Sequence, residues 1–193
     1  MKPDPYDTKM AKKLMADAGY PDGFKMTIHG PNDRYINDAK IAEALAQMLN
    51  RVGIEASVET MPKAVYFKRA SRGGPNKSPE FSFMLLGWGA GSGEASSPLK
   101  ALLHTYDKSK GLGAANRGRH SDAEVDKLVK QALATVDADA RGALLAKATE
   151  KAVGENYGVI PMHYQVNTWA AKAGYKYLPR TDERTIVTGL SKN

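Results

Sequence analysis

The sequence predicts an α/β fold, on two observations. An apolar run that ends at Trp88 leads into a glycine-rich loop and a capped helix start. Upstream, a strand pattern over 24–29, a helix pattern over 38–51 and a strictly alternating strand over 54–59 follow one another. This order is typical of a βαβ unit with two parallel strands. Because open α/β sheets bind small molecules at the carboxyl ends of their strands, the loop after Trp88 is the first candidate for a binding site.

Capping residues and apolar spacing predict four more helices around this unit. Their expected starts are Asp7, Pro62, Ser121 (in a capping box with Glu124), and Asp137 or Asp139. Residues 106–120 show little periodicity and are expected to form a long loop, ordered or mobile. Residues 158–164 are predicted to form a further strand, bent or at a sheet edge, because Pro161 cannot donate to a ladder.

The composition excludes several classes of protein. At 193 residues the chain can bury one sizeable core. It has no apolar run near about 18 residues, so no membrane span is expected, and its polar start does not resemble a secretory signal. The absence of cysteine excludes disulfides, Cys-type zinc sites and thiol catalysis. The net charge is +7, but the basic residues are spread without an aromatic platform, so no nucleic-acid partner is expected.

Enzymatic signals are equally sparse. The four histidines, at 29, 104, 120 and 163, are scattered, and no HExxH or GxSxG motif occurs. We therefore expect a binding module that is not an enzyme and has no cofactor and no resident metal.

The glycine-rich loop supports an alternative function. Glycines at 87, 89, 91 and 93 lie before a helix start, where backbone N–H groups can receive an anion. They do not complete GxGxxG, and Glu94 stands where a P-loop would have lysine. A small cytosolic α/β enzyme or nucleotide-binding domain that uses Gly87–Gly93 stays the alternative.

Five stretches of the chain carry a family resemblance. In order, they are PYDTKMAKKLMADAGYPDGF, PNDRYINDAKIAEALAQMLNRVGIEASVETMP, LLGWG, ANRGRHSDAEVDKLVKQA and VIPMHYQVNTWAAKAG. Together they resemble the family 5 bacterial extracellular solute-binding proteins, which are the dipeptide, oligopeptide and nickel type receptors of ABC importers. No single stretch is highly specific, but the ordered set is.

The resemblance implies a longer receptor whose two lobes close on a small solute. Residues 1–165 would be the carboxyl-terminal ligand-binding lobe, a periplasmic-binding-protein-like α/β lobe with a mixed sheet and flanking helices. Residues 166–193 would return toward a missing amino-terminal lobe. The chain is therefore expected to be a fragment without a signal peptide. The full receptor would be periplasmic and would dock on importer membrane subunits, and the uncovered lobe would tend to self-associate.

The resemblance also places Trp88 in the cleft between the lobes, although a core position at the strand end is the alternative. Peptide-binding members carry an aspartate three residues later that pairs with the amino group of the ligand, and here that position is Gly91. A buried cationic amine needs a carboxylate partner, so a strict peptide ligand is not expected. Sugar-phosphate conjugates, other amines, opine-like solutes and metal chelates stay open. Gly89 belongs to the same loop, and Glu94 could replace the missing carboxylate or be a solvated loop residue.

Three further residues are candidates for solute contact. Tyr66 lies near a position where the family's peptide binders place an aromatic residue in the cleft, and a core role is the alternative. Asn116 and Arg117 belong to the family-like segment before SDAEVD. Arg117 could bind a carboxylate bidentately or lie on the surface. Arg34 and Asp38 are predicted to fix the loop before the second helix.

Overall fold

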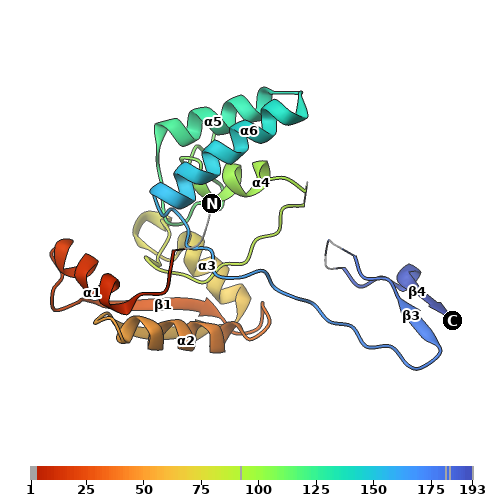
Figure 1. Ribbon diagram of the computed structural model, residues 1–193, viewed down its shortest axis with the longest axis horizontal. Helices are drawn as coiled ribbons and strands as arrows, with labels where there is room; N and C mark the ends of the chain where they lie inside the picture. The colour runs from red at the N-terminus through yellow and green to blue at the C-terminus, as the bar shows by residue number, and fades with distance from the viewer. Residues whose placement is uncertain (1–3, 92, 181, 183, 193) are drawn as a thin grey trace.

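A parallel βαβ unit forms one layer of the protein (Figure 1). The computed structural model describes residues 4–91, 93–180, 182 and 184–192. Strands β1 (Lys25–Pro31) and β2 (Glu55–Met61) pair in parallel, and α2 (Asp38–Asn50) connects them. The burial of β2 alternates residue by residue, which confirms the strand with one wet face that its sequence predicts.

A third strand segment extends this sheet on the other side of β1. The His29 N–H donates to the Phe83 carbonyl at 3.0 Å, and the Leu85 N–H donates to the His29 carbonyl at 2.8 Å. The predicted strand over 81–88 therefore pairs with β1 only around Met84. Because β1 ends at Pro31, residues beyond Leu85 have no strand beside them and run on as extended chain.

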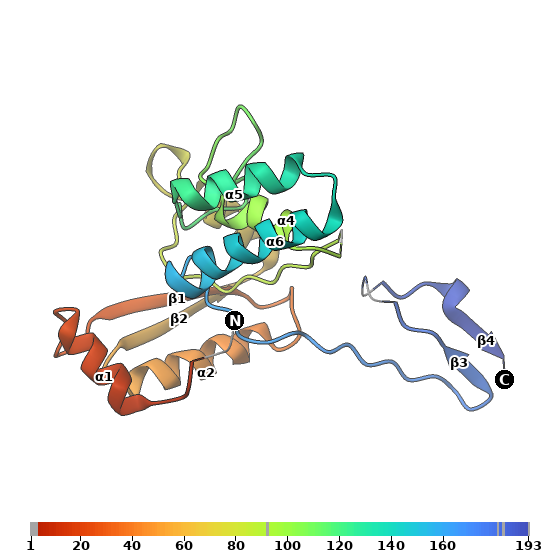
Figure 2. The ribbon, with the colours of Figure 1, turned by 45° about the horizontal axis from the view of Figure 1, so that its top comes forward.

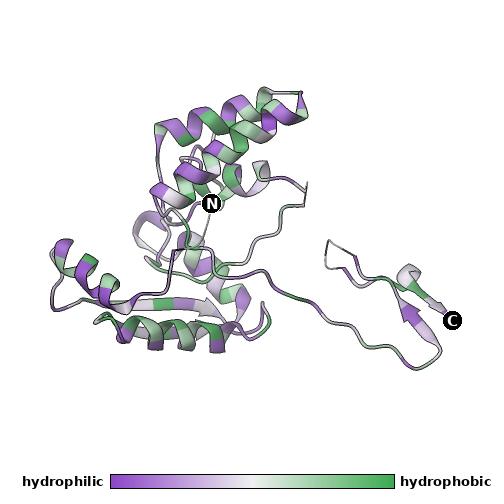
Figure 3. Ribbon diagram, in the orientation of Figure 1, coloured by the Kyte–Doolittle hydropathy of each residue, from purple (hydrophilic) through white to green (hydrophobic). Residues whose placement is uncertain are grey.

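The two faces of the sheet are covered differently. Ile28, Ala42 and Ala46 are buried between the sheet and α2, whose hydrophobic and hydrophilic residues alternate as expected for an amphipathic helix (Figure 3). The opposite face carries the polar pairs Thr27–Ser57 and Lys25–Glu55. Helix α3 (Lys63–Arg72) begins one residue after the predicted start at Pro62, which precedes it as the cap position, and covers part of that face through Tyr66. A short turn, η1 (Pro75–Lys77), leads from α3 to the third strand.

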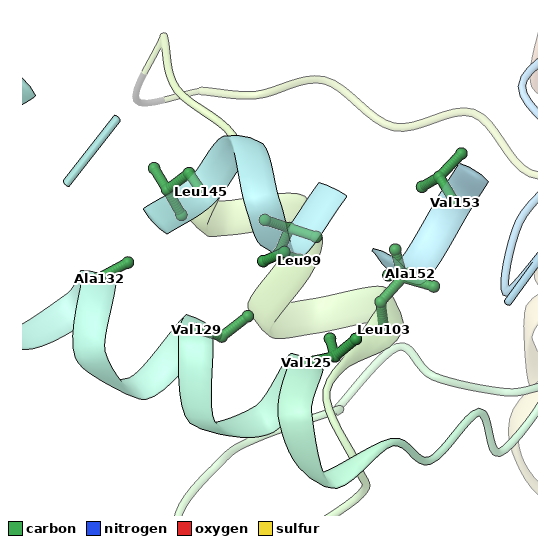
Figure 4. Close-up of a cluster of buried hydrophobic side chains, with 9 residues drawn as sticks. Leu99, Leu103, Val125, Val129, Ala132, Leu145, Ala152 and Val153 are labelled. Atoms are coloured by element: carbon green, nitrogen blue, oxygen red, sulfur yellow. The ribbon is translucent and has the colours of Figure 1, made fainter. Parts of the chain in front are cut away.

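A helical layer lies on the side of the sheet away from α2 (Figures 1 and 2). It contains α5 (Ala123–Ala134), α6 (Ala138–Thr149) and the short α4 (Ser96–Pro98), which continues as the π-type turn η2 (Leu99–Leu103). A second π-type turn, η3 (Glu150–Glu155), prolongs α6. Side chains of η2 point between α5 and α6 (Figure 4). The buried cluster consists of Leu99, Leu103, Val125, Val129, Ala132, Leu145, Ala148, Ala152 and Val153.

Two of the predicted helix caps are confirmed, one lies a residue away from its predicted position, and α4 follows Ala95 without a side-chain cap. Asp7 caps α1 (Thr8–Asp17) and Asp137 caps α6, both as predicted. At α5 the cap is Asp122, whose carboxylate accepts from the backbone N–H groups of Glu124 and Val125, each at 2.9 Å. The prediction of Ser121 is wrong because its hydroxyl is bonded to the Thr105 hydroxyl instead.

The carboxyl-terminal part leaves both layers as an extended segment (Figures 1 and 2). Residues 158–164 form no strand, so that prediction is wrong: Pro161 lacks an N–H group, and no strand of the described chain runs beside this segment. The segment ends in a small antiparallel pair, β3 (Tyr175–Tyr177) and β4 (Leu190–Lys192), with η4 (Val187–Gly189) between them. Parallel and antiparallel pairs thus occupy two separate sheets.

No helix in the described ranges is long and apolar enough to cross a membrane.

Candidate functional site

The candidate site lies at the carboxyl edge of the parallel sheet. The loop that follows β1 and the chain that follows the third strand meet there. The Tyr35 hydroxyl donates to the Gly87 carbonyl at 3.3 Å. A Cβ atom placed on Gly87 would lie only 2.7 Å from Cε1 of Tyr35, so the ring packs directly on this glycine. Tyr35 therefore fixes the backbone immediately before Trp88.

Asp38 organises the loop after β1. Its carboxylate is buried and accepts hydrogen bonds from the backbone N–H groups of Arg34 (2.9 Å), Tyr35 (3.0 Å) and Ala39 (2.9 Å). This confirms the loop-fixing role that the sequence predicts for Asp38. The Arg34 side chain lies over the Tyr35 ring, with the guanidinium carbon 5.0 Å from the ring centroid.

Trp88 and the glycines after it are open to solvent. The Trp88 side chain is 44% exposed. A Cβ atom added to Gly89 or Gly91 would meet no other atom within 4 Å. The predicted loop Gly87–Gly93 includes position 92, which lies outside the described residues. Nearly half of the Trp88 surface is therefore open to contact by a solute.

Glu94, the predicted substitute for the missing aspartate, already has partners. Its carboxylate accepts from the Ser96 hydroxyl and from Nε of Arg141, the latter at 3.0 Å. These bonds, that from Ser96 foremost, hold the pKa of Glu94 below its ordinary value. The group is a carboxylate in an ion pair rather than a free acceptor for a solute amine.

Tyr66 lies in the interior. Its side chain is fully buried, and its hydroxyl donates to the Leu85 carbonyl at 2.7 Å. Burial raises the pKa of this phenol, so it is neutral and acts as a donor. In this arrangement Tyr66 supports the third strand and presents no surface to a solute, which matches the core alternative.

Asn116 and Arg117 tie the loop over 106–120 to its surroundings. The buried Asn116 amide donates to the carbonyls of His104 (3.0 Å) and His120 (2.7 Å) and accepts from the His120 N–H group at 2.9 Å. Nε of Arg117 donates to the Ser71 hydroxyl at 3.1 Å, and its guanidinium lies over the Phe67 ring. Asn116 therefore ties this loop to His104 and His120, and Arg117 ties it to α3.

Arg69 is a further residue that the sequence reasoning missed. Its guanidinium bonds to Glu59 on β2 (2.5 Å) and to Glu80 before the third strand (2.5 Å). It also lies over the Phe81 ring, which stacks on His29 of β1 at 4.1 Å. Arg69 thus clamps the start of the third strand to the sheet. The sequence offers only a weak signal for it, because Arg69 is one of several basic residues on α3.

Among the residues that the structure describes, no three His, Asp or Glu side chains come together closely enough to hold a metal ion.

Open α/β sheets bind ligands in the crevice outside the carboxyl ends of their strands, and Trp88 lies at that edge here. The family described as "Bacterial extracellular solute-binding proteins, family 5 Middle" matches residues 1–110, and the chain belongs to this family. The match confirms the predicted family and does not favour the nucleotide-binding alternative.

Relatives of this family are much longer than the chain. The glutathione-binding protein GsiB of Escherichia coli strain K12 is 31% identical over 163 residues, which cover 83% of this chain and 30% of that protein. The structure of DppA from Helicobacter pylori in complex with the peptide STSA is similar with a TM-score of 0.66 at 29% identity, over 78% of this chain and 27% of that chain. HbpA2 from Haemophilus parasuis shares the fold over 97% of this chain and 36% of its own, with a TM-score of 0.77 at 22% identity.

We expect Gly87→Ala to destabilise the protein and Gly89→Ala to leave it unchanged. The new methyl group at position 87 would collide with Tyr35, whereas that at position 89 meets nothing within 4 Å. Overpacking of this kind costs about 1–3 kcal/mol, which urea unfolding would measure. Equal stability of the two variants would contradict the contact between Tyr35 and Gly87.

The Arg69 clamp predicts a loss of stability at acidic pH. Hydrogen bonds from Arg69 hold the pKa values of Glu59 and Glu80 below the ordinary 4.5. The unfolded state therefore takes up protons first, and this stabilisation is lost as the pH falls through the lowered values. Arg69→Gln should lower the thermal midpoint near neutral pH, and the difference should shrink as the pH falls below the ordinary carboxyl pKa value of 4.5. Arg72→Gln serves as control, and a difference that is constant with pH would contradict the clamp.

Proposed function

We propose that this chain is the carboxyl-terminal lobe of a solute receptor for an ABC importer. The observation that carries the proposal is the half-exposed Trp88 at the carboxyl edge of the sheet in a family 5 chain. A peptide or related small solute would lie on this edge while the remainder of the receptor closes over it. The role is binding, without a catalytic step.

The division of the chain follows from the same proposal. Residues 1–165 would form the ligand-binding lobe, and residues 166–193 would pass to the other lobe. The extended segment that leaves both layers supports this division (Figure 1). The full receptor would act in the periplasm and deliver its solute to the importer's membrane subunits.

The charges of the loop after Trp88 restrict the class of solute that the site can bind. GsiB is named a glutathione-binding protein, and DppA was solved with a peptide. In this chain Gly91 replaces the carboxylate of the peptide-binding pattern, and Glu94 is paired with Arg141. Solutes that lack a free amino group to anchor, including opine-like compounds, therefore fit the site better than simple peptides do.

Titration of the chain against glutathione, the peptide STSA and an opine tests the proposal. Since this chain would supply one wall of the cleft, we expect weak binding, with a dissociation constant of about 1 mM, seen as shifts of backbone amide signals by NMR. Trp88→Ala should abolish binding, and Trp169→Phe should preserve it. Binding that survives Trp88→Ala, or a melting-temperature increase with ATP but with none of these solutes, would refute the proposal.

We also propose that the chain associates with a second copy of itself. The extended segment exposes Ile160, Met162, Tyr164 and Val166 at alternating positions, with exposed fractions of 44–98%. Such a contiguous apolar stripe is unusual on a stable monomer. The segment's backbone also has free hydrogen-bonding groups, because the described part of 159–171 makes no backbone–backbone hydrogen bond.

Substitution of this stripe should weaken self-association. We expect Met162→Ser with Tyr164→Ser to raise the dimer dissociation constant at least about tenfold, because apolar burial is lost. Light scattering across a dilution series would measure it. Val136→Ser, which changes an equally exposed residue between α5 and α6, is the control. A chain that is monomeric at every concentration would contradict the proposal.

A further inference from the structure

We propose that two copies of the chain pair through their extended segments, as antiparallel strands related by a two-fold axis at His163. The partner is a second copy of this chain, and the pairing surface is the backbone edge of residues 160, 162, 164 and 166. The pairing rests on the self-association proposed above and assigns it to one contact.

The extended segment has the alternation of a strand that lacks a neighbour (Figures 1 and 2). Its apolar stripe occupies the even positions from 160 to 166. Among the odd positions, Nε2 of Gln165 donates to Oδ1 of Asn167 at 2.9 Å, so these two side chains share a face. Because side chains of a strand point alternately to opposite faces, this separation of even from odd positions is what a strand requires.

Pro161 determines which backbone edge can pair. Backbone groups of a strand alternate between its two edges, so the even positions point to one edge and the odd positions to the other. Pro161 lacks an N–H group and interrupts the odd edge. The even edge keeps a donor and an acceptor at each position of the stripe, and none of them makes a backbone–backbone hydrogen bond within the described ranges. Since proline is tolerated where its edge faces solvent, a partner strand would pair with the even edge.

No charged side chain of the segment opposes this contact. Between Glu155 and Lys172 the sequence contains no Asp, Glu, Lys or Arg. Natural proteins often place charges on exposed strand edges to prevent pairing with another chain. Two copies of this segment therefore approach each other with free hydrogen-bonding groups and without repulsion between fixed charges.

The order of the stripe residues selects the register. With the axis at His163, Ile160 lies opposite Val166. Met162 then lies opposite Tyr164, so every residue of the stripe faces another. An axis one residue away on either side would place one of the four opposite a glycine or a threonine outside the stripe. Paired β-branched side chains, and a thioether beside an aromatic ring, are favourable cross-strand contacts. The contact is isologous, as a two-fold dimer requires.

Single cysteines in the full chain test this register, because the chain contains no other thiol. Two copies of position 163 would form a pair without hydrogen bonds, with Cα atoms about 4.5 Å apart, a separation that a disulfide spans. Two copies of position 165 would lie four residues apart along the strand, about 13 Å. We expect His163→Cys to form disulfide-linked dimers in air at least about tenfold faster than Gln165→Cys. Both positions are exposed, so Gln165→Cys controls for random collision.

Position 161 supplies a matched partner for position 165, because the two lie opposite each other in this register. Gln165→Cys chains mixed with Pro161→Cys chains should therefore cross-link, although Gln165→Cys alone does not. Non-reducing electrophoresis over time measures all three rates. Fast cross-linking of His163→Cys and of the mixture, with slow cross-linking of Gln165→Cys alone, supports the pairing.

Two outcomes would overturn the pairing in different ways. If His163→Cys and Gln165→Cys cross-link at equal rates while light scattering shows a dimer of the unsubstituted chain, the copies associate through another surface. The register is then refuted, and self-association stands. If the unsubstituted chain is monomeric at every concentration, the proposed self-association fails, and the pairing fails with it.

Discussion

The candidate site depends on the pairing of one short strand segment with β1. Two hydrogen bonds of the His29 backbone hold residues 83–85 parallel to β1. Because this pairing is parallel, Gly87 and Trp88 lie at the carboxyl edge of the sheet, where the loop after β1 begins. A pairing of three residues is weak by itself. Side chains reinforce it at both ends: Arg69 clamps the start of the segment, and Tyr66 and Tyr35 bond to the carbonyls of Leu85 and Gly87.

Local patterns in the sequence predicted the elements whose causes are local. The alternation of β2 and the caps at Asp7 and Asp137 depend on neighbours within a few residues, and the structure confirms them. Asp122 and Ser121 are both competent caps, and the choice between them was decided by Thr105, which is distant in sequence. The predicted strand over 158–164 failed for a related reason. Apolar residues at alternating positions indicate that one face of a segment is to be buried. They do not show that another strand is available to pair with it.

The sequence predicted only part of the candidate site. Family resemblance directed attention to Trp88, which is exposed at the sheet edge. It directed attention to Tyr66 and Asn116 as well, yet their polar atoms serve the interior. A polar side chain that binds a solute and one that satisfies a buried carbonyl look alike in sequence, because burial is a tertiary property. Tyr35 was missed because a single aromatic residue in a loop belongs to no periodic pattern.

Two uncovered surfaces of the chain have a common physical cause. Trp88 with its glycine loop and the stripe of Ile160, Met162, Tyr164 and Val166 both expose apolar area that a stable monomer would bury. The loop lacks neighbours, so a partner that orders it must offset the conformational entropy of several glycines. Under the proposed function, weak binding by one lobe and tight binding on closure would be two consequences of the same exposed surface.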